Sequence, residues 1–226
     1  RFLAFVGIIS GKMPSINYPV QEQEIRAALL SRLALCSAQG RPAVVREEVT
    51  IGRARIDVLA LSHCLEGFEI KGDFDSTARL EKQVRCFSGA LDKLTLVVGH
   101  EHLSEGIRLV PKWWGVWLAE RARSGGVRFQ QVREAAANPG ETVLGLAGLL
   151  WRNELIEAFE QLTGRVPPKS ATADTLRERI AAYSSASAVR SVVLRRLQDA
   201  KRLEALEAAQ PRRPVCDIRF AGFSPA

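Results

Sequence analysis

The chain has 226 residues, 46% hydrophobic and 25% charged, with a formal net charge of +7 at pH 7. This balance is typical of a globular chain with room for one domain and an appendage, and the positive surplus favours acidic partners, above all nucleic acid. The sequence lacks the run of about 20 apolar residues that a membrane span requires, and its four cysteines show neither a CxxC pair nor zinc-ligand spacing. These features exclude a membrane-spanning protein and a zinc-finger framework, and they predict a cytoplasmic protein with reduced thiols.

Composition and apolar patterning divide the chain into four stretches. Residues 1–12 are expected to be an extension of doubtful origin, because the only methionine, Met13, is where translation would start. The pattern predicts an α/β core at residues 13–137 and a helical C-terminal region at residues 138–210. Residues 211–226 contain three prolines and a glycine and are expected to form a loose tail.

Apolar periodicity predicts the individual elements in chain order. In the core, helices are expected at residues 21–36 and ending near residue 91, and strands at residues 43–50, 55–61, 67–72, 94–98, 107–110, 114–118 and 127–132. The C-terminal region is expected to form helices at residues 149–162, 174–183 and 188–209. The predicted fold class is therefore α/β, with a mixed central sheet flanked by helices and an all-helical C-terminal region.

Charged residues stand on two of the predicted core strands. Asp57 lies on the strand at residues 55–61, and Glu69 and Lys71 share one face of the next strand because side chains alternate. A hairpin centred near Cys64 would place Asp57 opposite Lys71 and diagonal to Glu69, roughly 7–8 Å away. The two carboxylates and the Ile70 carbonyl could then hold a hard divalent cation, and Lys71 could orient or deprotonate a metal-bound water. The spacing alone is equally compatible with an ordinary ion pair between strands.

The context of these residues resembles the PD-(D/E)XK, or restriction-endonuclease-like, superfamily. The resemblance is carried by Arg55-Ile56-Asp57-Val58, by Glu69-Ile70-Lys71, by the connection Gly72-Asp73-Phe74-Asp75, and by Arg79-Leu80-Glu81-Lys82-Gln83 on the following helix. Residues 110–116 and 150–155 look like a bacterial group of small stand-alone members, which extends the similarity to about residue 206. The sequence departs from the motif name at Ile56, where the name has proline.

The resemblance implies a restriction-endonuclease-like core and a metal-dependent endo- or exodeoxyribonuclease, a phosphodiesterase of DNA repair or phage defence. It carries Asp57 and Glu69 over as ligands of Mg²⁺ or Mn²⁺, Lys71 as the catalytic lysine, and Gln83 as a residue that orders the site. Members of the superfamily often add a further acid. Glu24 on the first helix and Glu48 on the first strand are the two candidates, and the sequence does not choose between them.

Basic residues on two predicted helices are candidates for contacts with nucleic acid, with DNA favoured. They are Arg79, Lys82, Arg190, Arg195 and Arg196, and an ordinary solvated helix face is the alternative for each group. Residues 169–213 hold ten Lys or Arg and five Asp or Glu, so much of the positive surplus is regional. Two other functions remain open at this stage: a DNA-binding module that does not cleave, and an interaction protein whose C-terminal helices pair with another chain or form a homodimer.

Overall fold

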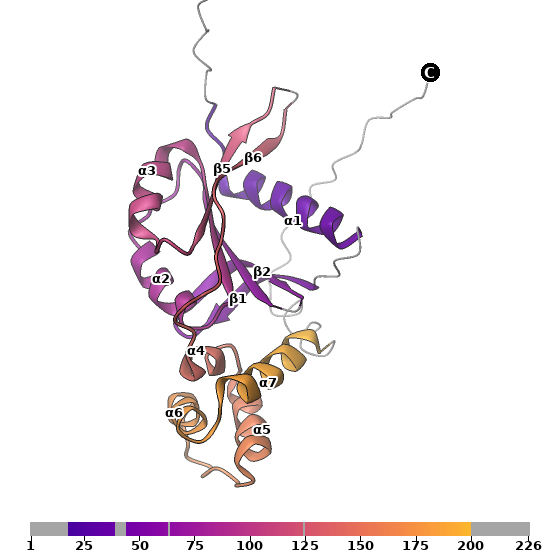
Figure 1. Ribbon diagram of the computed structural model, residues 1–226, viewed down its shortest axis with the longest axis vertical. Coiled ribbons are helices and arrows are strands. Elements are labelled where there is room, and N and C mark those ends of the chain that lie inside the picture. The colour runs from indigo at the N-terminus through magenta and orange to yellow at the C-terminus, as the bar shows by residue number, and fades with distance from the viewer. Residues whose placement is uncertain (1–17, 39–43, 63, 124, 200–226) are drawn as a thin grey trace, which may run out of the picture.

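The computed structural model describes residues 18–38, 44–62, 64–123 and 125–199. The expectations for the extension at residues 1–12, for the tail at residues 211–226 and for the end of the last helix fall outside these residues. The described chain is a mixed α/β fold with a six-stranded sheet and helices on both of its faces, followed by a C-terminal group of helices (Figure 1). The predicted fold class is confirmed at this level.

The sheet has its strands in the order in which they occur along the chain. They are β1 (Val44–Ile51), β2 (Ala54–Leu61), β3 (Leu65–Lys71), β4 (Lys93–Val98), β5 (Gly115–Arg121) and β6 (Val127–Arg133). The pairs β1–β2, β2–β3 and β5–β6 are antiparallel, whereas β3–β4 and β4–β5 are parallel. Each parallel pair needs a crossover connection, and the two crossovers contain α2 (Leu80–Ser88) and α3 (His100–Leu109).

Helices α2 and α3 cover one face of the sheet, and α1 (Glu22–Ala38) covers the other (Figure 1). Two separate apolar clusters record this division. Leu80 and Phe87 of α2 pack with Leu96 on the first face. Ile25 and Leu29 of α1 belong to the cluster on the second face.

Four helices complete the described chain: α4 (Val143–Ala147), α5 (Arg152–Thr163), α6 (Ala173–Tyr183) and α7 (Ala186–Gln198). They lie beyond one end of the sheet (Figure 1) and share a continuous apolar cluster with the α2 face. The backbone N–H of Gly52, in the turn between β1 and β2, donates to the carbonyl of Gly148 over 3.2 Å. None of the helices in the described ranges is both long and apolar enough to cross a membrane.

Two of the predicted elements are wrong. Residues 107–110 were expected to form a strand, but residues 107–109 are the last turn of the amphipathic helix α3, and Val110 follows it with extended backbone. The expected helix at residues 149–162 begins later, at Arg152. The buried Leu149 and Leu150 lie in the connection between α4 and α5. The sequence-based strands at residues 43–50, 55–61, 94–98, 114–118 and 127–132 agree with β1, β2, β4, β5 and β6 to within a few residues.

Candidate functional site

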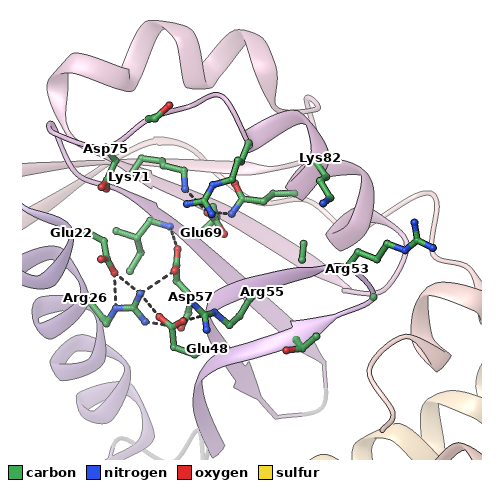
Figure 2. Close-up of a pocket in the computed structure, with 17 residues that line it drawn as sticks. Glu22, Arg26, Glu48, Arg53, Arg55, Asp57, Glu69, Lys71, Asp75 and Lys82 are labelled. Carbon is green, nitrogen blue, oxygen red and sulfur yellow. Dashed lines mark hydrogen bonds and ion pairs between the residues drawn. The ribbon is translucent and has the colours of Figure 1, made fainter. Parts of the chain in front are cut away.

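A polar cleft of about 630 Å³ opens where β2 and β3 separate, between the start of α1 and α2 (Figure 2). Its size lies within the usual range for ligand sites in proteins. Charged side chains from α1, β1, β2, β3 and α2 converge on it. They are Glu22, Arg26, Glu48, Arg53, Arg55, Asp57, Glu69, Lys71, Asp75, Arg79 and Lys82.

Glu69 forms the buried floor of the cleft and is only 1% exposed. Its Oε1 accepts hydrogen bonds from Lys71 Nζ at 2.7 Å and from Gln83 Nε2 at 2.6 Å. Two further buried oxygens, Glu69 Oε2 and Gln83 Oε1, accept no hydrogen bond from any described residue. A buried acceptor without a partner costs about 1–3 kcal/mol, so this pair of oxygens is suited to an additional cation or donor.

Asp57 lies beside Glu69, and its side chain accepts a backbone N–H of β3 that is not paired with a carbonyl of β2. The antiparallel pairing of β2 and β3 reaches Val58 and Phe68 and goes no further toward the cleft. Beyond that pair, Asp57 Oδ2 accepts the backbone N–H of Ile70 at 2.7 Å. The predicted register, with Asp57 opposite Lys71, is therefore wrong by two residues, because the hairpin turn is centred one residue earlier than expected.

Arg26 fills the opposite side of the cleft and is 6% exposed. Its guanidinium binds Asp57 Oδ1 at 2.9 Å and Glu48 Oε1 at 2.8 Å, and it forms a further ion pair with Glu22, one helical turn earlier on α1 (Figure 2). Its Nη1 also donates to the carbonyl of Asp57. A single buried cation therefore joins α1 to β1 and β2.

A break in the pairing of β1 with β2 places Glu48 in this network. Glu47 pairs with Val58 and Val49 pairs with Ile56 in one continuous register, so Glu48 stands opposite Asp57 at the position between them, where no pair forms. Its φ of 56° is left-handed, which is rare for a residue with a side chain and is maintained only where the surroundings determine it. Contacts with Arg26 and with Arg55, at 2.6 Å, provide those surroundings.

The two carboxyl groups at the floor hold protons more tightly than free carboxyl groups do. Burial raises the pKa of Glu69 to about 8, and the neighbouring Asp57 charge adds to this, whereas Lys71 acts in the opposite direction. Burial also raises the pKa of Asp57, against the opposing effects of the Ile70 N–H and of Arg26. The floor therefore carries less negative charge near neutral pH than its composition suggests.

Exposed basic side chains surround this floor. Arg53 and Arg55 stand on the β1–β2 hairpin, and Arg79 and Lys82 stand at the start of α2. Arg55 is paired with Glu48, and its side chain is 65% exposed. The cleft thus combines buried carboxylates with an exposed, basic rim.

The structure brings most of the predicted site residues together. Asp57, Glu69, Ile70, Lys71, Gln83 and Glu48 line the same cleft, and so do Arg79 and Lys82. Ile70 brings its N–H to Asp57, whereas the sequence analysis assigned a role to its carbonyl.

Glu24 does not line the cleft. Its carboxylate is bound by Arg121 of β5, at 2.6 and 2.8 Å, because two residues along a helix turn a side chain through roughly 200°. Glu22 is the acid of α1 that reaches the cleft. Its spacing of four residues from Arg26 is a sequence signal that could have identified it.

The predicted contacts on α7 lie away from the cleft. Arg190 is 2.5 Å from Asp92 and is also paired with Glu141, so it connects the C-terminal helices to the sheet. Arg196 is paired with Glu157 of α5. Arg195 is exposed in the last turn of α7.

Comparison with known proteins places the chain in a family. The sequence model of a family described as Bacteriophage P4 protein cII matches residues 17–210. The chain belongs to this family. Protein cII of Enterobacteria phage P4 is 28% identical over 143 residues, which are 63% of this chain and 54% of that protein. The chain thus spans about half the length of this curated relative, and no solved structure matches it.

Membership of the cII family corrects the assignment made from the sequence. The expected PD-(D/E)XK superfamily, and with it the deoxyribonuclease activity, the enzyme class and the roles in DNA repair or phage defence, is wrong. The resemblance depended on an Asp, a gap and Glu-x-Lys, a pattern that arises readily in a chain with 25% charged residues. The shared cleft of Asp57, Glu69, Lys71 and Gln83 remains as a structural finding, independent of that assignment.

Proposed function

We propose that this chain binds nucleic acid through the phosphate backbone at the cleft, together with a divalent cation of the Mg²⁺ or Mn²⁺ type at its floor. The observation that carries the proposal is the arrangement of charge: the buried carboxyl group of Glu69 and the partly buried one of Asp57 lie below an exposed rim of Arg53, Arg79 and Lys82. Exposed arginine and lysine side chains neutralise phosphates and release counterions, which gives affinity without base sequence specificity. The choice of DNA over RNA is a prediction from the sequence, and the charges of the cleft suit the phosphates of either.

The donor set at the floor fits a hard cation that arrives with a phosphate. Glu69 Oε2 and Gln83 Oε1 are the buried oxygens without a partner, and Asp57 lies beside them. No group of three or more His, Cys, Asp or Glu within the described ranges is arranged to hold a metal ion. Mg²⁺ commonly binds to one or two carboxylates and completes its shell with water and ligand phosphates. When bound, the cation would reduce the repulsion between the floor and a phosphate.

Each side chain then has a separate part in binding. Glu69 and Asp57 would hold the cation, and Gln83 would offer its free carbonyl oxygen to it. Lys71 already donates to Glu69 and places a positive charge at the floor, where a phosphate oxygen would approach. Arg79, at the N-cap of α2, and Lys82, in the first turn of α2, would contact neighbouring phosphates.

The experiment is a titration of fluorescently labelled DNA and RNA, single-stranded and duplex, followed by fluorescence anisotropy at several salt concentrations. We expect binding that weakens as salt rises, and that is strongly reduced in the double variant Arg79→Glu, Lys82→Glu. The matched control is Arg108→Glu, Lys112→Glu, which makes the same charge change at exposed positions outside the cleft. Absence of salt-dependent binding, or equal losses in the two double variants, would overturn the proposal.

The cation is tested separately by electron paramagnetic resonance, in which free Mn²⁺ gives a signal that bound Mn²⁺ loses. We expect the wild-type chain with DNA to bind Mn²⁺ more tightly than Glu69→Gln with DNA. Glu24→Gln is the matched control, since its carboxylate is bound by Arg121 outside the cleft. Equal Mn²⁺ binding by Glu69→Gln and the wild type would remove the cation from the proposal. The restriction-endonuclease-like form of the core and a homodimer both stay predictions, and neither is needed for binding at this cleft.

A further inference from the structure

A second, smaller pocket adjoins the cleft and has an exposed aromatic ring in its wall. It has a volume of about 380 Å³ and is lined by Gln21, Glu22, Gln23, Phe74 and Asp75. Glu22 and Asp75 also line the main cleft, so the two hollows share a wall. A chain-like ligand bound at the cleft floor could therefore extend into the smaller pocket and reach Phe74.

Phe74 is 72% exposed, in the turn that connects β3 to α2. Single exposed apolar side chains are common on protein surfaces and need no explanation by themselves. Phe74 differs from others on this chain in its position. Val166, at 82% exposure, and Tyr183, at 64%, both belong to the C-terminal helical region, whereas Phe74 follows Lys71 by three residues and lines the smaller pocket beside the cleft.

The turn that carries Phe74 is held in place by hydrogen bonds on both sides of the ring. Asp75 Oδ2 accepts the N–H of Gly72 at 2.7 Å, and the side chain and backbone of Asp73 are both bonded to Val20, at 2.7 and 2.9 Å. Gly72 packs so closely on α1 that an added Cβ would lie 2.5 Å from the backbone nitrogen of Glu22. The exposed ring therefore has a fixed support, so little conformational entropy would be lost when a ligand stacks on it.

We infer that this pocket receives an unpaired nucleobase of the nucleic acid whose phosphates occupy the cleft. The inference rests on the proposed function and adds the class of ligand: single-stranded or locally unpaired nucleic acid. The Phe74 ring offers a flat face for stacking, which every base can use. Gln21 and Gln23 offer amide donors and acceptors at the edge of the pocket, as the polar edge of a base requires. In a paired duplex both the face and the edge of the base would be covered.

The test compares a labelled single-stranded oligonucleotide, the same oligonucleotide with abasic positions, and the matching duplex, by fluorescence anisotropy. For the single strand we expect Phe74→Ala to weaken binding about 5- to 150-fold, the range of one base–aromatic stack, while duplex and abasic binding stay unchanged. Phe74→Tyr should restore single-strand binding. Tyr183→Ala, which removes an exposed aromatic ring outside the cleft, is the control and should bind as the wild type does. In a strand that contains 2-aminopurine, the base fluorescence should be quenched by the wild type and not by Phe74→Ala.

The outcomes separate this inference from the function on which it rests. Binding that is lost in Arg79→Glu, Lys82→Glu but unchanged in Phe74→Ala supports the cleft and overturns the base pocket. Equal losses of single-strand, abasic and duplex binding in Phe74→Ala also overturn the base pocket, because the effect would then not depend on a base. Absence of binding to every probe by the wild type overturns both.

Discussion

Two ionic clusters in this chain are built from the same residue types but differ in how fully their acceptors are satisfied. At the junction between the sheet and the C-terminal helices, Arg190 meets two carboxylates, Asp92 and Glu141, and Asp92 also accepts the N–H of Leu65 at 2.6 Å. In the cleft, the buried Arg26 alone is in ion-pair contact with four carboxylates, and Glu69 beside them keeps an oxygen without a partner.

The difference separates a structural contact from a site that can accept a ligand. At the junction the acceptors have donors, so an added cation or anion would gain little. In the cleft the carboxylates outnumber the buried cations near them, and two oxygens remain unsatisfied, which leaves a place for a further positive charge. The predictions below test this contrast by removing or adding single charges in each cluster.

The largest effect is expected for Arg26→Met, which removes the buried guanidinium that pairs with carboxylates of α1, β1 and β2. Breaking a buried ionic network from one side destabilises a protein by about 3–5 kcal/mol, because the opposite charges stay buried without partners. Unfolding in urea at neutral pH measures the loss, and Mg²⁺ should recover part of it, since the freed carboxylates can bind the ion. Arg32→Met, on the same helix with its guanidinium 5.0 Å from the Trp117 ring, is the control. A variant that Mg²⁺ fails to stabilise would contradict the excess of acceptors in the cleft.

Arg190→Met should have a smaller effect, about 2 kcal/mol, because the Arg190 side chain is itself 26% exposed and pairs with two carboxylates, whereas the Arg26 side chain is 7% exposed and pairs with four. In this cluster Mg²⁺ should not compensate, since Asp92 keeps the N–H of Leu65. Binding of nucleic acid should be unchanged in the folded variant. The control is Arg195→Met, exposed on the same helix, for which the change in unfolding free energy should stay within about 0.5 kcal/mol. If the folded Arg190→Met variant binds nucleic acid more weakly than the wild type, Arg190 belongs to the binding surface after all.

The pH dependence of stability should identify Glu69. Its pKa in the folded chain, about 8, lies above the ordinary value of 4.5, so the folded state binds this proton more tightly than the unfolded state does. The stabilising contribution of the protonated form is therefore present below about pH 4.5 and is lost as the pH rises toward about 8. Glu69→Gln should remove most of that decline, measured by urea unfolding across the range.

Glu24→Gln is the matched comparison for this measurement. The hydrogen bond from Arg121 lowers the pKa of Glu24, so its carboxylate stabilises the folded chain at higher pH and loses this effect as the pH falls. The two variants should therefore change the slope of stability against pH in opposite directions. A slope that is the same in Glu69→Gln and in the wild type would show that Glu69 is ionised at neutral pH.

The order of the core elements could be predicted from the sequence, because each strand is a short apolar run bounded by turn residues. The failures occurred where one pattern fits two structures. The segment from Ile107 to Val110 has the composition of a strand. Its place at the end of a helix is seen only in the structure, where Gly106 of α3 packs against Leu96 of β4. Periodicity cannot distinguish a strand of this length from the last turn of a helix.

The site could be predicted in part. Asp57, Glu69 and Lys71 were found because alternation along neighbouring strands fixes which side chains share a face. Arg26 was missed because a cationic residue on an amphipathic helix is ordinarily solvated, and its burial depends on contacts with Glu48 of β1 and Asp57 of β2, which lie far from it in the sequence. The function inferred from the same residues was wrong, since their spacing is too common to identify a family. Arg190 shows the same limit, because a regional excess of charge does not reveal which charges are paired.

The smallest effect on stability is expected for Arg53→Ala, at an exposed position in the β1–β2 hairpin on the rim of the cleft. The unfolding free energy should change by no more than about 0.5 kcal/mol, because the side chain is largely hydrated. Its effect should appear in binding instead. If Arg53 contacts one phosphate, the slope of log K against log salt should decrease by about 0.9 for duplex DNA, and by about 0.7 for a single strand. Arg195→Ala, equally exposed on α7, should leave this slope unchanged, and equal slopes for the two variants would place the phosphate-binding surface elsewhere on the chain. The cleft and the junction would then differ in their internal charge balance but not in their contact with nucleic acid.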